Sequence, residues 1–100
     1  MKAPKIRCAA VRYQLMVDKG TDKFQTIEGY SHSDCYTALS FMGLYENKRN
    51  MEVEEEGFLL EDGTFVNRFK AMGIALHNNQ VKSLYTNGYP LLYSYMLKEH

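Results

Sequence analysis

Asn67 and Arg68 are neighbours at the start of a segment with helical spacing, and their side chains have the chemistry to hold a phosphorylated ligand. An arginine guanidinium can donate two parallel hydrogen bonds to a phosphate, and a helix N-terminus favours negative charge. An asparagine amide can bond a base edge or a ribose, and the nearby Phe58 ring can stack on a base. We therefore predict ligand-binding roles for these three residues. The alternative for Asn67 is a helix cap, for Arg68 a solvated residue of the first turn, and for Phe58 a core residue.

Residues that could do catalysis are few. The sequence contains no GxSxG, P-loop, GxGxxG or HExxH motif, and its three histidines are widely separated. Cys35 falls on an apolar helical stripe, which favours core packing over a nucleophile. The glutamates at 52 and 54–56 lack the spacing of a calcium loop, so we interpret them as a solvated sheet edge. These patterns predict a protein that is not an enzyme and has no metal site and no cofactor.

Composition narrows the class of protein further. The chain has 100 residues, 45% of them apolar, and equal numbers of basic and acidic residues, 12 of each. Zero net charge argues against a general nucleic-acid coat, so we expect no DNA partner. No apolar run approaches the ~20 residues of a membrane span, and Arg7 and Arg12 interrupt the only stretch that resembles a signal peptide. We expect a cytoplasmic protein whose Cys8 and Cys35 are reduced.

The hydrophobic pattern predicts the elements that position these residues. Strands at 6–17 and 23–30 form a hairpin, a helix spans 33–43 after an N-cap at Ser33, and a polar loop follows at 46–50. A hairpin at 57–66 turns at Asp62-Gly63 and leads into a helix at 68–77. We expect Ala9, Val11, Tyr13, Leu15 and Val17 on the buried face of the first strand, and Phe69, Met72, Ala75 and Leu76 on that of the second helix.

The fold predicted from this order is α+β: one small domain over 1–100, with an antiparallel sheet and two helices packed on one face. The tail at 89–100 carries apolar and aromatic residues almost to its end, so it docks on its own core or on a second copy. A short chain with zero net charge and an aromatic tail also favours a homo-oligomer.

Three stretches of the sequence resemble one family of small phage proteins: GYSHSDCYTALSFMGLYENK, EEEGFLLEDGTFVNRFKAMGIALHNNQV and LLYSYML. The chain resembles the phage anti-Thoeris proteins that sequester cyclic ADP-ribose isomers, and EGFLLEDGTFVNR is the most specific part. The resemblance implies a symmetric oligomer that binds its signal at a subunit interface without cleaving it, in the cytoplasm of an infected host. It adds His32 and Asp34 to the ligand-binding residues, because they match an HHD-like helix start.

The sequence departs from the pattern of this family at three places. Glu56 stands where the family has glutamine, Ser31-His32-Ser33 replaces Arg-His-His, and Ser94-Tyr95-Met96 replaces an acidic SED segment. These departures leave open which cyclic nucleotide is bound. A small cyclic oligonucleotide is one of the alternatives. The leading hypothesis is sequestration of a cyclic nucleotide immune signal. The alternatives are a phage module that inhibits a host protein through a tyrosine- and methionine-rich surface, and a small phosphodiesterase.

Overall fold

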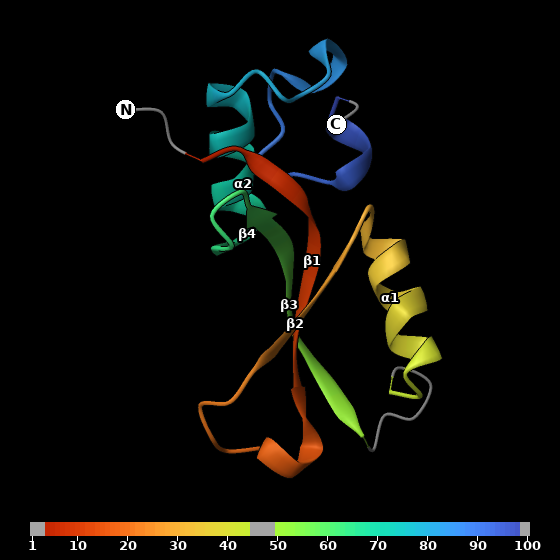
Figure 1. Ribbon diagram of the computed structural model, residues 1–100. Helices are drawn as coiled ribbons and strands as arrows, with labels where there is room; N and C mark the ends of the chain where they lie inside the picture. Colours follow the sequence, from red (N-terminus) through yellow and green to blue (C-terminus); the bar gives the residue numbers. More distant parts are fainter. Residues whose placement is uncertain (1–3, 45–49, 99–100) are drawn as a thin grey trace.

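The fold is a four-stranded antiparallel sheet with two helices, seen in a computed structural model that describes residues 4–44 and 50–98 (Figure 1). The strand order is β2-β1-β3-β4. The elements are β1 (Ile6–Leu15), β2 (Gln25–Gly29), α1 (His32–Phe41), β3 (Met51–Leu60), β4 (Phe65–Asn67) and α2 (Arg68–His77). Short 3-10 turns lie at Met16–Asp18, Ser83–Tyr85 and Ser94–Met96. The structure confirms the α+β class, and neither helix has the length and apolar character of a membrane span.

The first hairpin is shorter than the sequence pattern predicts. β1 ends at Leu15 because Met16–Asp18 form a 3-10 turn, whose end at Lys19 bonds back to Met16. This turn swings Val17 away from the sheet, and its side chain is 88% exposed. The prediction that Val17 belongs to the buried face is therefore wrong, whereas Ala9, Val11 and Tyr13 are buried as expected.

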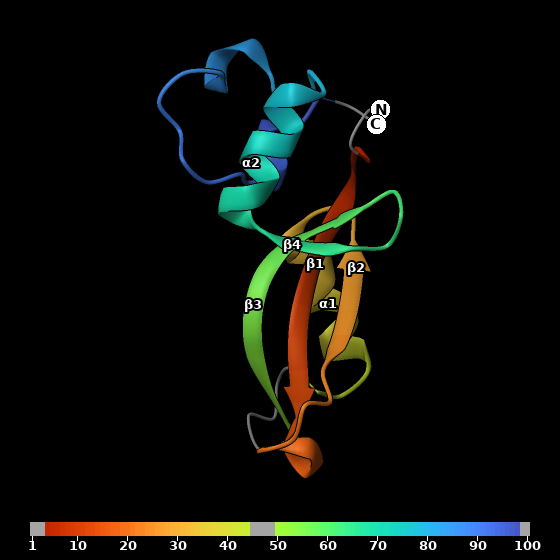
Figure 2. The same cartoon turned by 90° about the vertical axis from the view of Figure 1, so that its left-hand side faces the viewer.

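Helix α1 begins one residue earlier than predicted and ends two residues earlier, at Phe41, and Ser31 rather than Ser33 is its N-cap. The Ser31 hydroxyl accepts a hydrogen bond from the Asp34 amide, and the Asp34 carboxylate accepts one from the Ser31 amide. This reciprocal pair satisfies two amides that the first turn leaves without helical partners. The helix lies against β1 and β2 and buries Cys35 and Leu39 (Figure 2).

The hairpin predicted at 57–66 begins earlier, because the acidic stretch before residue 57 is part of β3. Residues 51–56 form the first half of β3 and pair only with β1, because β4 pairs with residues 57–59 alone. The glutamates at 52, 54 and 55 are exposed there, on the open edge of the sheet. The hairpin turn after β3 uses Gly63, whose φ of +87° favours glycine. The loop predicted at 46–50 lies almost wholly outside the described residues.

Helix α2 has the predicted bounds and the predicted cap, and it buries Met72 and Ala75 as expected, but its buried face is shifted away from Phe69 and Leu76. Asn67 is the N-cap, and its side chain accepts a hydrogen bond from the Lys70 amide at 2.8 Å. The buried residues are Ala71, Met72 and Ala75, which follow Arg68 at helical spacing. Phe69 is 69% exposed and Leu76 is 42% exposed, so their predicted burial is wrong. The face that carries Arg68 turns inward because the C-terminal segment packs against it.

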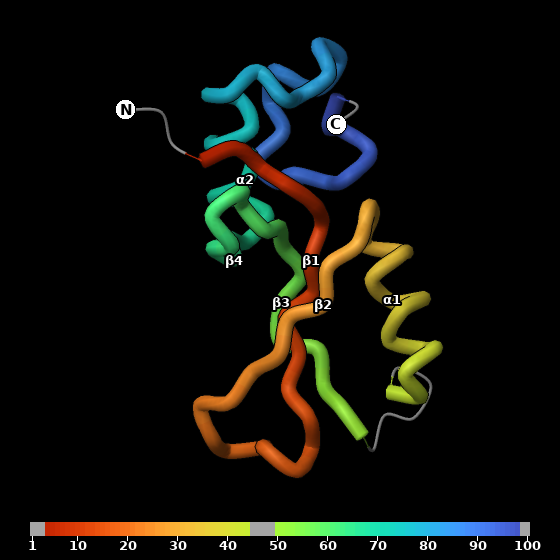
Figure 3. Tube along the Cα trace, in the orientation of Figure 1, coloured from red at the N-terminus to blue at the C-terminus, as the bar shows by residue number. Residues whose placement is uncertain are grey.

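The C-terminal tail docks on the core of its own chain. Leu92, Met96 and Leu97 are buried, and Leu97 forms a bridge with Val81. The chain trace shows the tail passing beside α2 and reaching the start of α1 (Figure 3). Both helices and this tail contribute to one continuous hydrophobic cluster with β1, β3 and β4. The tail therefore brings residues 93–95 next to the N-terminus of α1.

Candidate functional site

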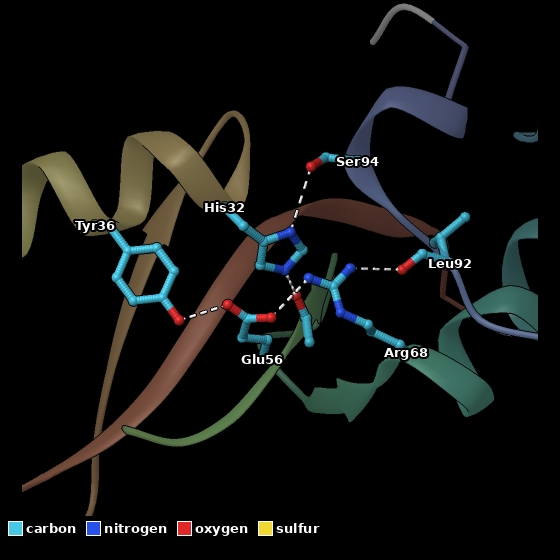
Figure 4. Close-up of polar contacts among 7 residues, drawn as sticks. His32, Tyr36, Glu56, Arg68, Leu92 and Ser94 are labelled. Atoms are coloured by element: carbon cyan, nitrogen blue, oxygen red, sulfur yellow. Dashed lines mark hydrogen bonds and ion pairs between the residues drawn. The ribbon is translucent and has the colours of Figure 1, made fainter. Parts of the chain in front are cut away.

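His32 links the start of α1 to β3 and to the tail. Its Nε2 lies 2.7 Å from the carbonyl oxygen of Gly57, and its Nδ1 lies 3.3 Å from the Ser94 hydroxyl (Figure 4). A carbonyl only accepts, so Nε2 carries the proton and Nδ1 of the neutral ring accepts from Ser94. Burial lowers the pKa of His32, with a further lowering from the Arg68 charge; the hydrogen bond to Gly57 and the charge of Glu56 oppose this shift. The neutral ring is the form that this site favours.

Arg68, the first residue of α2, is held from three sides. Its Nη2 donates to Glu56 Oε1 at 3.0 Å, and its Nη1 donates to the carbonyl oxygen of Leu92 at 2.8 Å (Figure 4). Its guanidinium carbon lies 4.4 Å from the centre of the Tyr93 ring, a cation–π contact. Only 14% of the side chain is exposed. Arg68 therefore ties β3, α2 and the tail together.

Glu56 is the negatively charged partner of Arg68. Its other oxygen, Oε2, accepts a hydrogen bond from the Tyr36 hydroxyl of α1 at 2.5 Å. Burial opposes ionisation of Glu56, but the hydrogen bonds from Tyr36 and Arg68 outweigh it, so the pKa is lowered. Glu56 is thus an ionised carboxylate at neutral pH, and it offsets the charge of Arg68.

A pocket of about 490 Å³ opens where α1, α2 and the tail meet. It is mainly aromatic and hydroxylic, with one histidine and one arginine. Its lining residues are Tyr30, Ser31, His32, Ser33, Arg68, Tyr93, Ser94 and Tyr95. The volume falls within the range of small-molecule sites. Rings for stacking, hydroxyls for hydrogen bonds and a guanidinium thus share one pocket.

The structure brings together two of the five residues predicted to bind a ligand. His32 and Arg68 line the pocket, whereas Asp34 and Asn67 serve as capping residues outside it. Phe58 is fully buried, and its ring meets the His32 ring edge-on at 5.0 Å. Its ring lies in the core and has no exposed face on which a base could stack. It packs against the His32 ring instead.

The pocket residues that sequence reasoning did not single out as ligand-binding all carry a hydroxyl. They are Tyr30, Ser31, Ser33, Tyr93, Ser94 and Tyr95. One signal in the sequence points to them. Of the places at which the chain departs from the pattern of the anti-Thoeris proteins that it resembles, residues 31–33 and 94–95 line this pocket, and Glu56 pairs with its Arg68. The departures form a single cluster in space.

The cysteines lie outside this pocket and are free thiols. Cys35 is fully buried, and burial raises its pKa to about 11, so it is a protonated thiol at neutral pH. Burial also raises the pKa of Cys8, with a further rise from Glu28. Among the described residues, no three His, Cys, Asp or Glu side chains gather as a metal site.

Comparison with known proteins places most of the chain in one family. The family model described as Phage T4 y16D protein matches residues 5–97, which include both helices, the sheet and the pocket. Neither a curated protein nor a solved structure matches the chain.

Proposed function

The chain belongs to the family described as Phage T4 y16D protein, and from this premise we propose that it is a phage-encoded, non-enzymatic binder of a cyclic nucleotide immune signal. In this proposal the protein holds a cyclic ADP-ribose isomer, or a small cyclic oligonucleotide, in the cytoplasm of the infected host. Sequestration keeps the signal from the host defence that depends on it. The motifs shared with anti-Thoeris proteins support this choice of ligand.

The observation that carries the proposal is the pocket between α1, α2 and the tail. Tyr30, Tyr93 and Tyr95 offer rings on which an adenine can stack, and their hydroxyls can bond a ribose. A cyclic ADP-ribose isomer is a compact ligand with one base, two riboses and two phosphates. A pocket of about 490 Å³ suits a ligand of that size better than an extended peptide.

The phosphates of the ligand bind at the start of α1 and at Arg68. Ser33 is exposed within the pocket lining at the first turn of α1, the end at which a helix favours negative charge. Arg68 already donates to Glu56 and Leu92, so a phosphate competes with the Glu56 carboxylate for Nη2. Release of Glu56 costs part of the binding energy, while Tyr36 continues to donate to the carboxylate.

The same groups favour binding without cleavage. The His32 ring is neutral, and its Nε2 proton is committed to the Gly57 carbonyl, so the ring is poorly placed as a general acid. The Ser94 hydroxyl donates to Nδ1 of the neutral ring, and Ser94 is the first residue of the 3-10 turn in the tail. The buried Cys35 thiol lies outside the pocket. We therefore propose storage of the intact ligand.

Isothermal titration calorimetry with cyclic ADP-ribose isomers tests this function. The recovered ligand is then run on an ion-exchange column beside an untreated sample. We expect binding at micromolar concentration or tighter, with the ligand eluting unchanged. Cleaved ligand identifies a phosphodiesterase, and no heat with any isomer or small cyclic oligonucleotide overturns the proposal.

One feature favours a second candidate, a module that inhibits a host protein. Phe69 and Leu76 share an exposed face of α2, and Phe41 at the end of α1 is 88% exposed. An exposed apolar face of a helix offers a contact surface for another protein. This candidate predicts that Phe69→Ser abolishes protection of the phage in a Thoeris-bearing host, while variants of the pocket leave protection unchanged.

A further inference from the structure

The charges of this chain are separated along its length, although they sum to zero. Between Asp62 and Glu99 there is no acidic residue, whereas Arg68, Lys70 and Lys82 lie in that interval with Lys98. This segment forms α2 and the tail, which gather at one end of the molecule (Figure 1). Most of the acidic residues belong to the hairpins and to α1. The Arg68 side chain is 14% exposed and paired with Glu56, so the exposed charges of this segment are those of Lys70, Lys82 and Lys98.

Four tyrosines of the tail form a connected row at this end of the molecule. The Tyr89 ring contacts Tyr85 edge-on at 5.5 Å between centres, and Tyr85 contacts Tyr95 in the same way at 5.7 Å. Tyr95 stacks on Tyr93 at 5.8 Å, with 19° between the ring planes. Tyr93 in turn lies under the Arg68 guanidinium. We call Tyr85, Tyr89, Tyr93 and Tyr95 the tyrosine row.

The tyrosine row is accessible, and the backbone of an exposed lysine lies beside it. Tyr95 is 60% exposed and Tyr89 is 45% exposed, a large exposure for rings that both contact Tyr85. Lys82 is exposed, and its amide donates to the Met96 carbonyl while its carbonyl accepts from the Tyr85 amide. These bonds fix the Lys82 backbone beside both ends of the Tyr85–Tyr95 contact. An exposed lysine thus stands at this point of the tyrosine row.

We propose that the tyrosine row binds a single-stranded oligonucleotide. Successive bases of a single strand stack on aromatic side chains while basic residues follow the phosphates, and this mode tolerates any sequence. A duplex keeps its bases paired and stacked, so it leaves the exposed rings unused. Zero net charge argues against a general nucleic-acid coat, but a local track needs only the residues of this end.

This inference goes beyond the signal-binding function and shares part of its surface. Tyr93 and Tyr95 line the pocket, whereas Tyr85, Tyr89 and Lys82 lie outside it. A strand that covers Tyr95 therefore competes with a ligand in the pocket. Substitutions at Tyr89 and Lys82 affect the strand alone, and a substitution at Tyr30 affects the pocket alone. The two functions can fail independently.

Fluorescence anisotropy with labelled 12-mers tests the binding mode. The probes are oligothymidylate, oligouridylate and a 12-base-pair DNA duplex, each at 50 and 200 mM salt. We expect either single strand to bind at least tenfold tighter than the duplex, and its affinity to fall by about five- to tenfold over that salt range. The two single strands distinguish DNA from RNA as the source. Equal binding of duplex and single strands, or no binding at 100 µM protein, overturns the proposal.

Matched variants locate the contact on the tyrosine row. Tyr89→Leu keeps the bulk but removes the aromatic face, and we expect about tenfold weaker binding of the single strand. Tyr89→Phe keeps the face and retains affinity, while Lys82→Gln weakens binding and flattens the salt dependence. Phe41→Ala, on the exposed end of α1, serves as the control with unchanged affinity. If Tyr89→Leu binds the strand as tightly as Tyr89→Phe, the row is not the binding surface.

Discussion

Arg68 and Leu92 exchange two hydrogen bonds: the Arg68 Nη1 donates to the Leu92 carbonyl at 2.8 Å, and the Leu92 amide donates to the Arg68 carbonyl at 3.0 Å. The side chain and the backbone carbonyl of Arg68 thus bond both the carbonyl and the amide of Leu92. We call this pair of hydrogen bonds the clasp. It joins the tail to the first turn of α2. The pocket wall formed by Tyr93, Ser94 and Tyr95 follows directly after it.

Loss of the clasp is expected to destabilise the fold. Arg68→Ala removes the bonds to Leu92 and Glu56 together with the contact to Tyr93, so we expect a loss of about 2–3 kcal/mol in the free energy of unfolding. Urea denaturation followed by circular dichroism measures it. Lys70→Ala, an exposed residue of the same turn, is the control and changes stability by less than about 0.5 kcal/mol. Equal losses in the two variants contradict a structural role for Arg68.

Stability is expected to fall with acidification through His32. Its folded-state pKa lies below the ordinary value of 6.5, because burial disfavours the charged ring. The stabilisation is fully present above pH 6.5, where both states are neutral, and it is lost as the pH falls through the folded-state pKa. Unfolding free energies from pH 8 to 4.5 measure the slope. His32→Gln flattens the curve below pH 6.5, and an unchanged slope in that variant contradicts the assignment.

Glu56 is expected to add a second acid-sensitive step at lower pH. Burial works against its charge, but the hydrogen bonds from Tyr36 and Arg68 place its pKa below the ordinary value of 4.5. The stabilisation is present above pH 4.5 and disappears as the pH falls through the lowered pKa. Carbon-detected NMR titration of the Glu56 carboxyl in the parent and in Tyr36→Phe reads it directly. Removal of the Tyr36 hydroxyl raises this pKa; no change means that the bond does not hold the carboxylate.

The cysteines are expected to be dispensable for binding. Cys35 is fully buried with a pKa of about 11, so it reacts with a thiol reagent at pH 8 only when the fold opens. Cys8 is half-buried and reacts faster. The double serine variant still binds the signal, with about 1–3 kcal/mol lost from burial of the Cys35→Ser hydroxyl. Loss of binding in a variant that stays folded points to thiol or metal chemistry instead.

Self-association is expected through the exposed face of α2. Phe69 and Leu76 are apolar and exposed there, and zero net charge offers no repulsion between copies. Light scattering at micromolar concentration therefore gives a mass above the 11.6 kDa of one chain. Phe69→Asp lowers the mass, while Phe41→Asp leaves it unchanged. Deletion of residues 91–100 is a poorer test, because it removes Leu92, Met96 and Leu97 from the core. A strictly monomeric parent contradicts a site shared between subunits.

Local signals in the sequence were sufficient for much of the fold. Alternation predicted β1, and the helical spacing with Asn67 as N-cap predicted α2 with the bounds that it has. Asp62-Gly63 marked the turn between β3 and β4, because that turn needs the positive φ of glycine. Each of these signals acts between residues close in sequence. Such local signals can be recognised in a single sequence without knowledge of its tertiary contacts.

Packing across the chain decided the rest. The sequence pattern assigns Phe69 and Leu76 to the core with Met72 and Ala75, but the tail bonds Arg68, and the buried side of α2 shifts toward Arg68 and Ala71. The pocket likewise joins the start of α1 to residues 93–95, which are about sixty positions later in the chain. No local spacing predicts that meeting. Phe58 was predicted to stack on a base for the same reason, since its burial depends on elements remote in sequence.

A crystal structure of the protein with a cyclic ADP-ribose isomer tests the central claim most directly. We predict density for one intact ligand in the pocket, with its base against Tyr95 or Tyr30 and a phosphate within hydrogen-bond distance of Ser33 or Arg68. Broken ligand, or ligand at a surface that shares no residue with this pocket, contradicts the account.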